Sequence, residues 1–123
     1  MTTKEEVQLF LADFRVKLKT FDILFRDERN KNTQALLLLE IPPAQRRKLV
    51  ESLTVADYSE GPLNDNLYGI ASLWVFGKRV KQTEFYLKIS MGRVNQQVLC
   101  ISFHPSQKPM PYPFNNPAKW TAL

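Results

Sequence analysis

The chain has 123 residues, of which 44% are hydrophobic and 24% are charged, and its formal net charge at pH 7 is +5. This length fits a single domain with a substantial core and is too short for two domains. The longest uninterrupted apolar run, Ala35 to Leu39, is far shorter than the ~20 residues that cross a bilayer. The first residues lack a signal-peptide pattern and the single cysteine cannot form an internal disulfide, so we expect a cytoplasmic protein without membrane contact.

The positive charge is concentrated in the C-terminal part of the chain. Residues 1–75 hold ten basic and eleven acidic side chains, whereas residues 76–123 hold seven basic side chains and a single acid, Glu84. Such an asymmetry favours an anionic partner, most often a nucleic acid. The alternative is a solvated surface that only keeps the protein soluble, and charge alone does not decide between the two.

The N-terminal segment predicts a helix followed by a strand. Residues 3–6 (Thr-Lys-Glu-Glu) have the spacing of a helix capping box, and apolar residues at helical spacing follow in residues 7–14. Residues 15–26 then alternate between apolar and polar side chains as a strand does, with a possible break near Thr20. Residues 27–32 are highly polar and predict a charged turn.

Two further helices and a loop are expected before the sheet. Residues 33–40 contain a run of four leucines and predict a short buried helix. Pro42-Pro43 ends that segment and can open a helix over residues 44–53, because proline is tolerated in a first turn. The basic cluster of residues 46–48 on this helix either contacts RNA or forms a solvated face. Residues 54–66 contain Gly-Pro and predict a loop.

Residues 67–105 predict three antiparallel strands that form a core wall and a polar face. We expect strands over residues 67–76, 85–90 and 98–104, with a hairpin loop over residues 77–82. Side chains alternate between the two faces of a strand. One face then carries the apolar residues Phe85, Leu87, Ile89, Leu99, Ile101 and Phe103. The opposite face carries Tyr86, Lys88, Ser90, Cys100, Ser102 and His104.

The C-terminal residues predict an extension beyond the single domain of residues 1–104. Residues 105–123 contain five of the eight prolines, so we expect an extended conformation. The same segment holds Tyr112, Phe114 and Trp120. These aromatic side chains either clamp onto the body of the protein or bind a partner.

Several kinds of site fit this composition poorly. One histidine and one cysteine make no soft-ligand cluster, and the acidic residues lack metal-binding spacing, so we expect no metal. The four glycines have neither phosphate-loop nor dinucleotide-binding spacing, and we expect no cofactor. Cys100 and His104 share a predicted strand face but lie about 13 Å apart, too far for the imidazole to activate the thiol.

The remaining chemistry is metal-independent cleavage of an RNA phosphodiester, because RNA carries its own nucleophile, the 2′-hydroxyl. A nuclease must remove that proton, protonate the leaving 5′-oxygen and stabilise charge on phosphorus. His104 can transfer a proton near neutral pH, Lys88 can stabilise charge, and Tyr86 can bind phosphate or stack on a base. The loop residues expected to contact RNA are Lys78, Arg79, Lys81 and Gln82. The alternative for His104 is a structural histidine near a strand end.

Four segments of the chain together resemble a known family. They are residues 53–58 (Leu-Thr-Val-Ala-Asp-Tyr), Trp74, residues 86–89 (Tyr-Leu-Lys-Ile) and residues 99–104 (Leu-Cys-Ile-Ser-Phe-His). Their order and spacing resemble the MqsR-type (motility quorum-sensing regulator) toxins of bacterial toxin–antitoxin pairs, which are small RelE-like mRNA interferases. The likeness covers roughly residues 35–104, and its most specific part is the Tyr-Leu-Lys-Ile block.

This resemblance implies an α+β, RelE-like fold in which N-terminal helices pack on a twisted antiparallel sheet. It implies the toxin of a type II pair, which cleaves mRNA without a metal and is neutralised by a cognate antitoxin protein. Tyr86 falls on a tyrosine of the family's active site, and His104 falls where the family has a lysine. A basic family residue maps near Glu60 and a glutamine maps onto Val75, so those two roles lie elsewhere or are absent.

Two functions of other classes stay open. A non-catalytic nucleic-acid-binding module would use the same basic face and give salt-sensitive binding without any product. A protein-binding accessory factor would use the aromatic side chains of the C-terminal extension as its contact.

Overall fold

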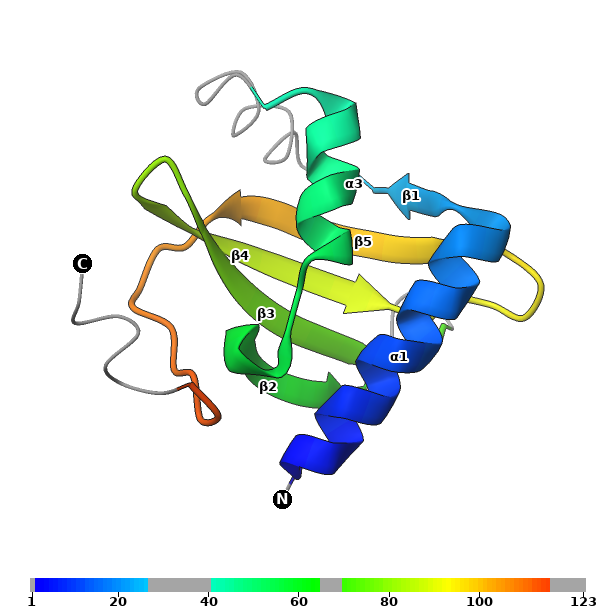
Figure 1. Ribbon diagram of the computed structural model, residues 1–123, viewed down its shortest axis with the longest axis horizontal. Helices are drawn as coiled ribbons and strands as arrows, with labels where there is room; N and C mark the ends of the chain where they lie inside the picture. The colour runs from blue at the N-terminus through cyan, green and yellow to red at the C-terminus, as the bar shows by residue number, and fades with distance from the viewer. Residues whose placement is uncertain (1, 27–40, 65–69, 116–123) are drawn as a thin grey trace.

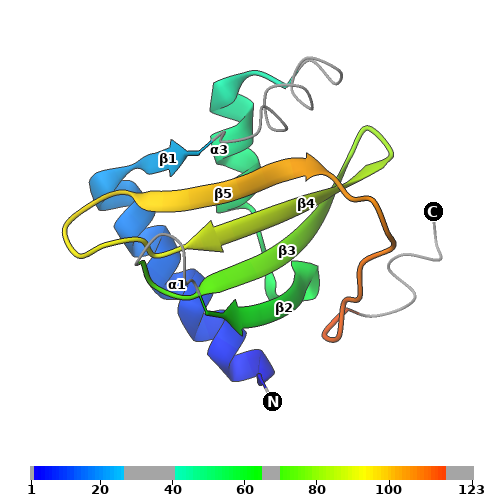
Figure 2. The ribbon, with the colours of Figure 1, turned by 180° about the vertical axis from the view of Figure 1, so that it is seen from behind.

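The computed structural model describes residues 2–26, 41–64 and 70–115, which form a two-layer α+β fold (Figure 1). Helices α1 (Lys4–Phe21) and α3 (Pro43–Glu51) lie on one face of a five-stranded sheet. Figure 2 shows the opposite face of the sheet, which neither helix covers and which we call the open face. The strands are β1 (Ile23–Phe25), β2 (Tyr58–Leu63), β3 (Leu73–Val80), β4 (Thr83–Ser90) and β5 (Val98–Pro105), in the order β1-β5-β4-β3-β2.

The sheet is mixed, which corrects the expectation of an antiparallel sheet at one edge. The three central strands β3, β4 and β5 are antiparallel, as their sequences predict. Strand β1, however, follows α1 directly and pairs in parallel with β5. The short 3₁₀ helix η1 (Val55–Asp57) leads into β2 at the other edge.

Some predicted features lie outside the described residues. These are the charged turn over residues 27–32, the buried helix over residues 33–40, and Trp120. Among the residues that the structure does describe, no helix has the length and hydropathy needed to cross a bilayer.

Helix α1 begins as its sequence predicts and ends later. The Thr3 hydroxyl accepts a hydrogen bond from Glu6 N–H, and the Glu6 carboxylate accepts one from Thr3 N–H, both at 3.2 Å. The strand expected over residues 15–26 is wrong for residues 15–21, because Leu18 continues the apolar stripe of the helix and is buried, whereas Val16 is 67% exposed. The strand-like alternation is confirmed only in the three residues of β1.

Helix α3 confirms the predicted helix after the two prolines. Pro42 precedes the first turn and Pro43 lies in it, where its missing N–H has no helical partner to lose. Val50 is buried, Leu49 packs against the core while half-exposed, and Leu53 is buried just after the helix, which ends at Glu51 and not at residue 53 as predicted. The helix therefore covers the sheet with the apolar side that the sequence indicates.

Strand β2 lies where the sequence predicts a loop, so that interpretation is wrong for the middle of residues 54–66. Gly61-Pro62 is tolerated because β2 is an edge strand, where a proline need not donate to a neighbouring strand. Two register shifts interrupt its pairing with β3 and hide the alternation that would mark a strand.

The hairpin between β3 and β4 is tighter than predicted. Pairing continues to Val80 and Thr83, so the loop consists only of Lys81 and Gln82. Both have positive φ values, 50° and 69°, as a two-residue turn of this handedness requires. The loop expected over residues 77–82 is therefore wrong, and its first four residues belong to β3.

Strand β5 contains a β-bulge at Ile101. The register with β4 slips by one residue there, so that Ser102 lies opposite Lys88 while Cys100 lies opposite Ile89. One extra residue on one strand reverses the alternation of side chains between the two faces.

The bulge decides which side chains of β5 enter the core. After it, Phe103 is fully buried and His104 lies on the open face, as predicted. Before it, Val98 and Cys100 belong to the core, and Leu99 does not. The expectation that Cys100 shares a face with His104 is wrong, because the two residues lie on opposite sides of the sheet.

The core lies between the helices and the sheet, and it fixes which side chains of the strands project to the open face. Its largest fully buried side chains include Phe14, Leu18, Leu53, Phe76, Phe85, Leu87, Ile89 and Phe103. Each contributes about 1.5–3 kcal/mol by leaving water. Because alternate residues of β4 are held in this way, the side chains between them must project to the open face.

Candidate functional site

Four polar side chains that the sequence places on one face do lie together on the open face. In the pairing of β4 with β5, Tyr86 lies opposite His104 and Lys88 lies opposite Ser102. Directly paired residues project to the same side of a sheet. All four side chains are half-buried, so each remains accessible from solvent.

Tyr86 and His104 form a stacked pair. Their ring centroids are 5.2 Å apart and the angle between the ring planes is 14°. The Nζ atom of Lys88 lies 5.7 Å from the centroid of the Tyr86 ring, within the range of a cation–π contact. The structure thus brings the three predicted catalytic residues into one cluster.

The surroundings of His104 decide which ring nitrogen carries a proton. Its Nδ1 atom lies 2.9 Å from the carbonyl oxygen of Pro105. Because a carbonyl oxygen can only accept, Nδ1–H must be the donor. The neutral imidazole therefore presents Nε2 as its basic atom, while Nδ1 is held by its hydrogen bond to the backbone.

Two effects raise the pKa of the Tyr86 phenol above its ordinary value. Burial raises the pKa of its phenol, and the nearby carboxylate of Glu60 raises it further. Glu60 pairs with Val75 across a register shift of β2, which places it on the open face. At neutral pH Tyr86 is thus a hydrogen-bond donor and not a base.

The stacked pair borders a hollow of about 210 Å³. It is lined by Tyr86 and His104 of the sheet and by Ser106, Gln107 and Lys108, which follow β5. The second group belongs to the predicted C-terminal extension. Residues from the sheet and from the extension therefore line the same cavity.

Residues 106–115, which we call the C-terminal strap, are fastened to the sheet through Glu84. The N–H of Ser106 donates to the backbone carbonyl of Glu84 at 2.8 Å. The Glu84 carboxylate accepts from Met110 N–H at 3.3 Å and from the Tyr112 hydroxyl at 2.6 Å. Burial raises the pKa of Tyr112, and this hydrogen bond to Glu84 raises it further, so the phenol stays protonated as the donor.

The aromatic side chains of the strap pack on the body of the protein. A Cβ atom at Gly77 of β3 would overlap the phenol of Tyr112. The Phe114 ring stacks on Tyr58, with centroids 5.5 Å apart and 27° between the planes. In Figure 2 the strap leaves β5 and passes the ends of β4 and β3. Of the two alternatives for these side chains, clamping onto the body is the one that the structure contains.

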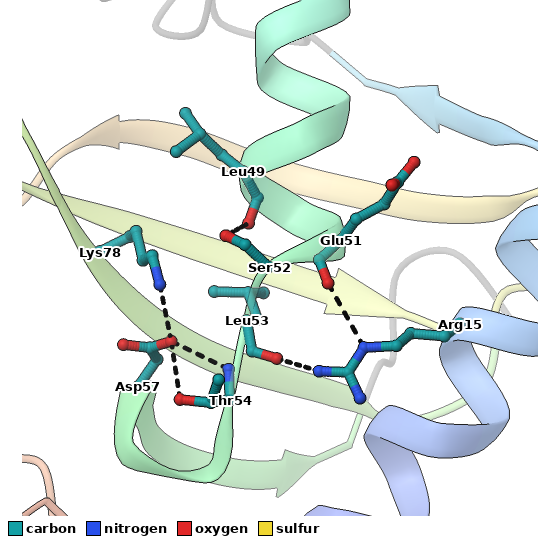
Figure 3. A network of polar contacts seen from close by, with 8 residues as sticks. All are labelled: Arg15, Leu49, Glu51, Ser52, Leu53, Thr54, Asp57 and Lys78. Atoms are coloured by element: carbon teal, nitrogen blue, oxygen red, sulfur yellow. Dashed lines mark hydrogen bonds and ion pairs between the residues drawn. The ribbon is translucent and has the colours of Figure 1, made fainter.

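Lys78 lies on the other face of the sheet from the candidate site. Its Nζ atom is 3.1 Å from Oδ2 of Asp57, whose side chain is only 3% exposed (Figure 3). The same carboxylate oxygen accepts from Thr54 N–H at 2.9 Å and from the Thr54 hydroxyl at 3.2 Å. Lys78 therefore belongs to the contacts that secure the entry to β2.

The residues predicted to contact RNA do not form one group. Arg79 follows Lys78 in β3 and lies opposite Glu84 of β4 in the strand register, on the open face. Lys81 and Gln82 are exposed in the turn at the end of the sheet. The sequence predicts one loop that holds all four residues. Instead, β3 continues to Val80 and separates them.

A second contact ties α1 to the end of α3, also in Figure 3. Arg15 donates from Nε to the carbonyl oxygen of Glu51 at 3.3 Å, and from its guanidinium to the carbonyl of Leu53. On α3, Arg47 pairs with Glu51 at 2.8 Å and also with Asp22. Arg47 thus serves intramolecular pairs, which agrees with a solvated face more than with an RNA contact.

The sequence alone did not point to several residues at the site. Glu60 lies in a strand that reads as a loop, and Gln107 and Lys108 lie in a proline-rich segment without periodicity. A signal did exist for the strap: a glycine inside a strand, such as Gly77, often marks a close approach of another part of the chain.

No family model matches the chain, and no match is found among curated proteins or among solved structures. Within residues 2–26, 41–64 and 70–115, no three histidine, cysteine, aspartate or glutamate side chains gather as metal ligands would. What the open face offers is a stacked phenol and imidazole, an ammonium group, and a hollow beside them.

Proposed function

We propose that the chain is a metal-independent endoribonuclease that cleaves mRNA by attack of the 2′-hydroxyl. One observation carries the proposal: Tyr86 and His104 stack beside an accessible hollow, with the Lys88 ammonium next to the phenol ring. An imidazole, a cation and an aromatic platform are the groups that this reaction needs. They lie within one patch formed by two neighbouring strands.

Each group has a defined part in the proposed reaction. His104 accepts the 2′-hydroxyl proton at Nε2, and the 2′-oxygen bonds to phosphorus as the bond from phosphorus to the 5′-oxygen breaks. Lys88 stabilises the charge that develops on the phosphoryl oxygens and protonates the leaving 5′-oxygen. Tyr86 positions the substrate by stacking and by its hydroxyl. The products are a 2′,3′-cyclic phosphate and a 5′-hydroxyl.

The proposal extends to the biological class. The Tyr-Leu-Lys-Ile block and the order of the other segments support an MqsR-type toxin of a type II toxin–antitoxin pair with a RelE-like fold. An α+β architecture with helices on one side of the sheet is compatible with that fold. The expected partners are mRNA and a cognate antitoxin protein.

The deciding experiment incubates the purified protein with defined RNA in the presence and absence of EDTA. We expect cleavage in both, cyclic phosphate ends on the products, and no cleavage at a 2′-deoxy position. His104→Ala should lower the rate by about 10²–10⁴-fold, as loss of a proton-transfer group does. Gln96→Ala, an exposed substitution at the other end of the sheet, is the control. Full activity of His104→Ala would refute the role given to the imidazole.

A non-catalytic nucleic-acid-binding module is the second candidate, and one observation favours it. Stacked rings beside a cation and a polar wall also suit the binding of single strands without any proton transfer. This function predicts binding that weakens with salt and leaves the RNA intact after long incubation. Product analysis in the experiment above separates the two.

A further inference from the structure

The hollow on the open face is lined by residues of two chemical kinds. The sheet contributes the aromatic pair in which Tyr86 stacks on His104. The strap contributes the polar residues Ser106, Gln107 and Lys108. The volume of the hollow, about 210 Å³, is below the ~300–1,000 Å³ of pockets that hold drug-sized ligands. A ligand that consists of one ring system and a short attached chain fits such a space better than a larger molecule.

The strap residues that line the hollow belong to a segment that is hydrogen-bonded to the sheet. The strap is held before and after the hollow, by Ser106 N–H on the Glu84 carbonyl and by Tyr112 on the Glu84 carboxylate. Tyr112 also occupies the space left by the absent side chain of Gly77. Groups held at both ends of a segment keep a defined position relative to the rings, which recognition of a ligand requires.

Among the three strap residues, two have side chains suited to a ligand. The Ser106 hydroxyl already donates to the carbonyl oxygen of Lys108 at 2.5 Å and thereby closes the turn. The Gln107 amide carries a donor and an acceptor side by side, and the Lys108 ammonium carries a charge; both residues are exposed. Stacking holds any base, because every base has a π-face, whereas an amide can distinguish the edges of bases.

We propose that this hollow is a subsite for one unpaired nucleobase, in which Gln107 reads the base edge and Lys108 binds the adjoining phosphate. The proposal rests on the proposed function in that its ligand is RNA. It adds a source of sequence preference that lies outside the catalytic cluster. The strap supplies this preference, and Tyr112 acts as a positioning residue that keeps Gln107 at the proper distance from the stacked rings.

The test uses the full chain and short homo-oligonucleotides of each of the four bases, made with 2′-deoxyribose so that they cannot be cleaved by 2′-hydroxyl attack. Fluorescence anisotropy gives four dissociation constants for each variant. We expect the constants of the unaltered protein to differ by about tenfold between best and worst base, since one well-placed pair of hydrogen bonds discriminates by ~1–3 kcal/mol. Gln107→Ala should bring them within about twofold, and Gln96→Ala should leave them unchanged.

Two further variants separate the parts of the subsite. Lys108→Ala should weaken binding of all four oligonucleotides alike and reduce the salt slope by about one. Tyr112→Ala should reduce base discrimination as Gln107→Ala does, although it lies outside the hollow, and Tyr112→Phe should restore part of it because the ring still packs on β3. Each variant is checked for a cooperative unfolding transition.

The outcomes distinguish this proposal from the nuclease proposal. Loss of discrimination in Gln107→Ala supports the subsite whether or not RNA is cleaved. Equal binding of the four oligonucleotides by the unaltered protein, or discrimination that survives Gln107→Ala, overturns the subsite even if cleavage is observed. Absence of RNA cleavage with intact base discrimination overturns only the nuclease.

Discussion

The phenol of Tyr112 fills the space that any side chain at Gly77 would need, so a residue of the strap and a residue of β3 fit as complementary surfaces. Gly77 is paired with Tyr86 on the neighbouring strand, and Tyr86 is paired with His104 on the next. The strap is therefore fixed directly beside the stacked rings. Stability and the shape of the candidate site depend on the same contact.

The first prediction concerns this contact. Gly77→Ala should destabilise the protein by about 1–3 kcal/mol, because the added methyl group displaces Tyr112 from a filled space. In a Tyr112→Ala background the same change should be neutral, or stabilising by about 0.4–1 kcal/mol, because alanine restricts the unfolded chain. Urea unfolding of the four proteins in a double-mutant cycle measures the coupling. Equal costs in both backgrounds would mean that the two residues do not interact.

The second prediction separates the two lysines that the sequence treats alike. Lys88→Gln should reduce the slope of log affinity for RNA against log salt concentration by about one, because Lys88 lies on the open face beside Tyr86. Lys78→Gln should leave that slope unchanged, because Lys78 is engaged with Asp57 on the helix side. Binding titrations at several salt concentrations decide this. An equal effect of both substitutions would contradict the assignment of faces.

The third prediction concerns the contacts of Asp57. Asp57→Ala should lower the free energy of unfolding by about 2–4 kcal/mol, because it leaves two donors of Thr54 and the Lys78 ammonium without their acceptor. Asp13→Ala, at an exposed position of α1, should change it by less than about 0.5 kcal/mol. Urea unfolding measures both. A cost for Asp57→Ala no larger than that of its control would show that the network contributes little.

The fourth prediction concerns stability at alkaline pH. Burial raises the pKa of the Cys100 thiol from its ordinary value of 9.0 to about 12. The folded state therefore keeps a proton that the unfolded state loses, and this contribution to stability is complete below pH 9 and is lost as the pH rises toward 12. In that range the titration of this thiol should lower the free energy of unfolding by about 1.4 kcal/mol per pH unit.

The measurement for the thiol is a series of unfolding curves between pH 8 and pH 11, with Cys100→Ala beside the unaltered protein. The variant should show a shallower loss of stability with pH, although its absolute stability is lower because a buried group is removed. Tyr86 and Tyr112 also have raised pKa values and will cause part of the loss in both proteins. Identical slopes would show that the thiol titrates alike in the folded and unfolded states.

The parts of the fold that the sequence predicts are those in which local pattern and burial agree. The capping box and apolar stripe predict the start of α1, and the alternation in β4 predicts that Phe85, Leu87 and Ile89 are buried, although Ser90 is buried as well. The strand expected over residues 15–26 is wrong for residues 15–21 because a short alternating pattern also fits the surface of a helix. Strand β2 was missed because register shifts and Gly61-Pro62 break its alternation, and only its partner β3 makes it a strand.

The candidate site was predicted where it depends on alternation along one strand and was missed where it depends on segments distant in sequence. Tyr86 and His104 meet because each follows a buried residue of its own strand. Glu60 lies near these rings because β2 is an irregular edge strand, and Lys108 lies near them because it belongs to the strap. No periodic pattern in the sequence predicts either position. The position of Lys78 depends on how far β3 extends, which its pairing with β4 decides.

The extra residue in β5 allows Cys100 and Phe103, three positions apart, to enter the same interior, because Ile101 takes no part in the pairing with β4. A chain shortened by Ile101 would keep Ser102, Phe103 and His104 opposite the same residues of β4, and the strand would simply become regular. A chain that kept Ile101 but paired it with Lys88 would instead turn Phe103 to water and His104 to the interior. Related proteins can therefore lose this one residue without exchanging the two faces of the sheet.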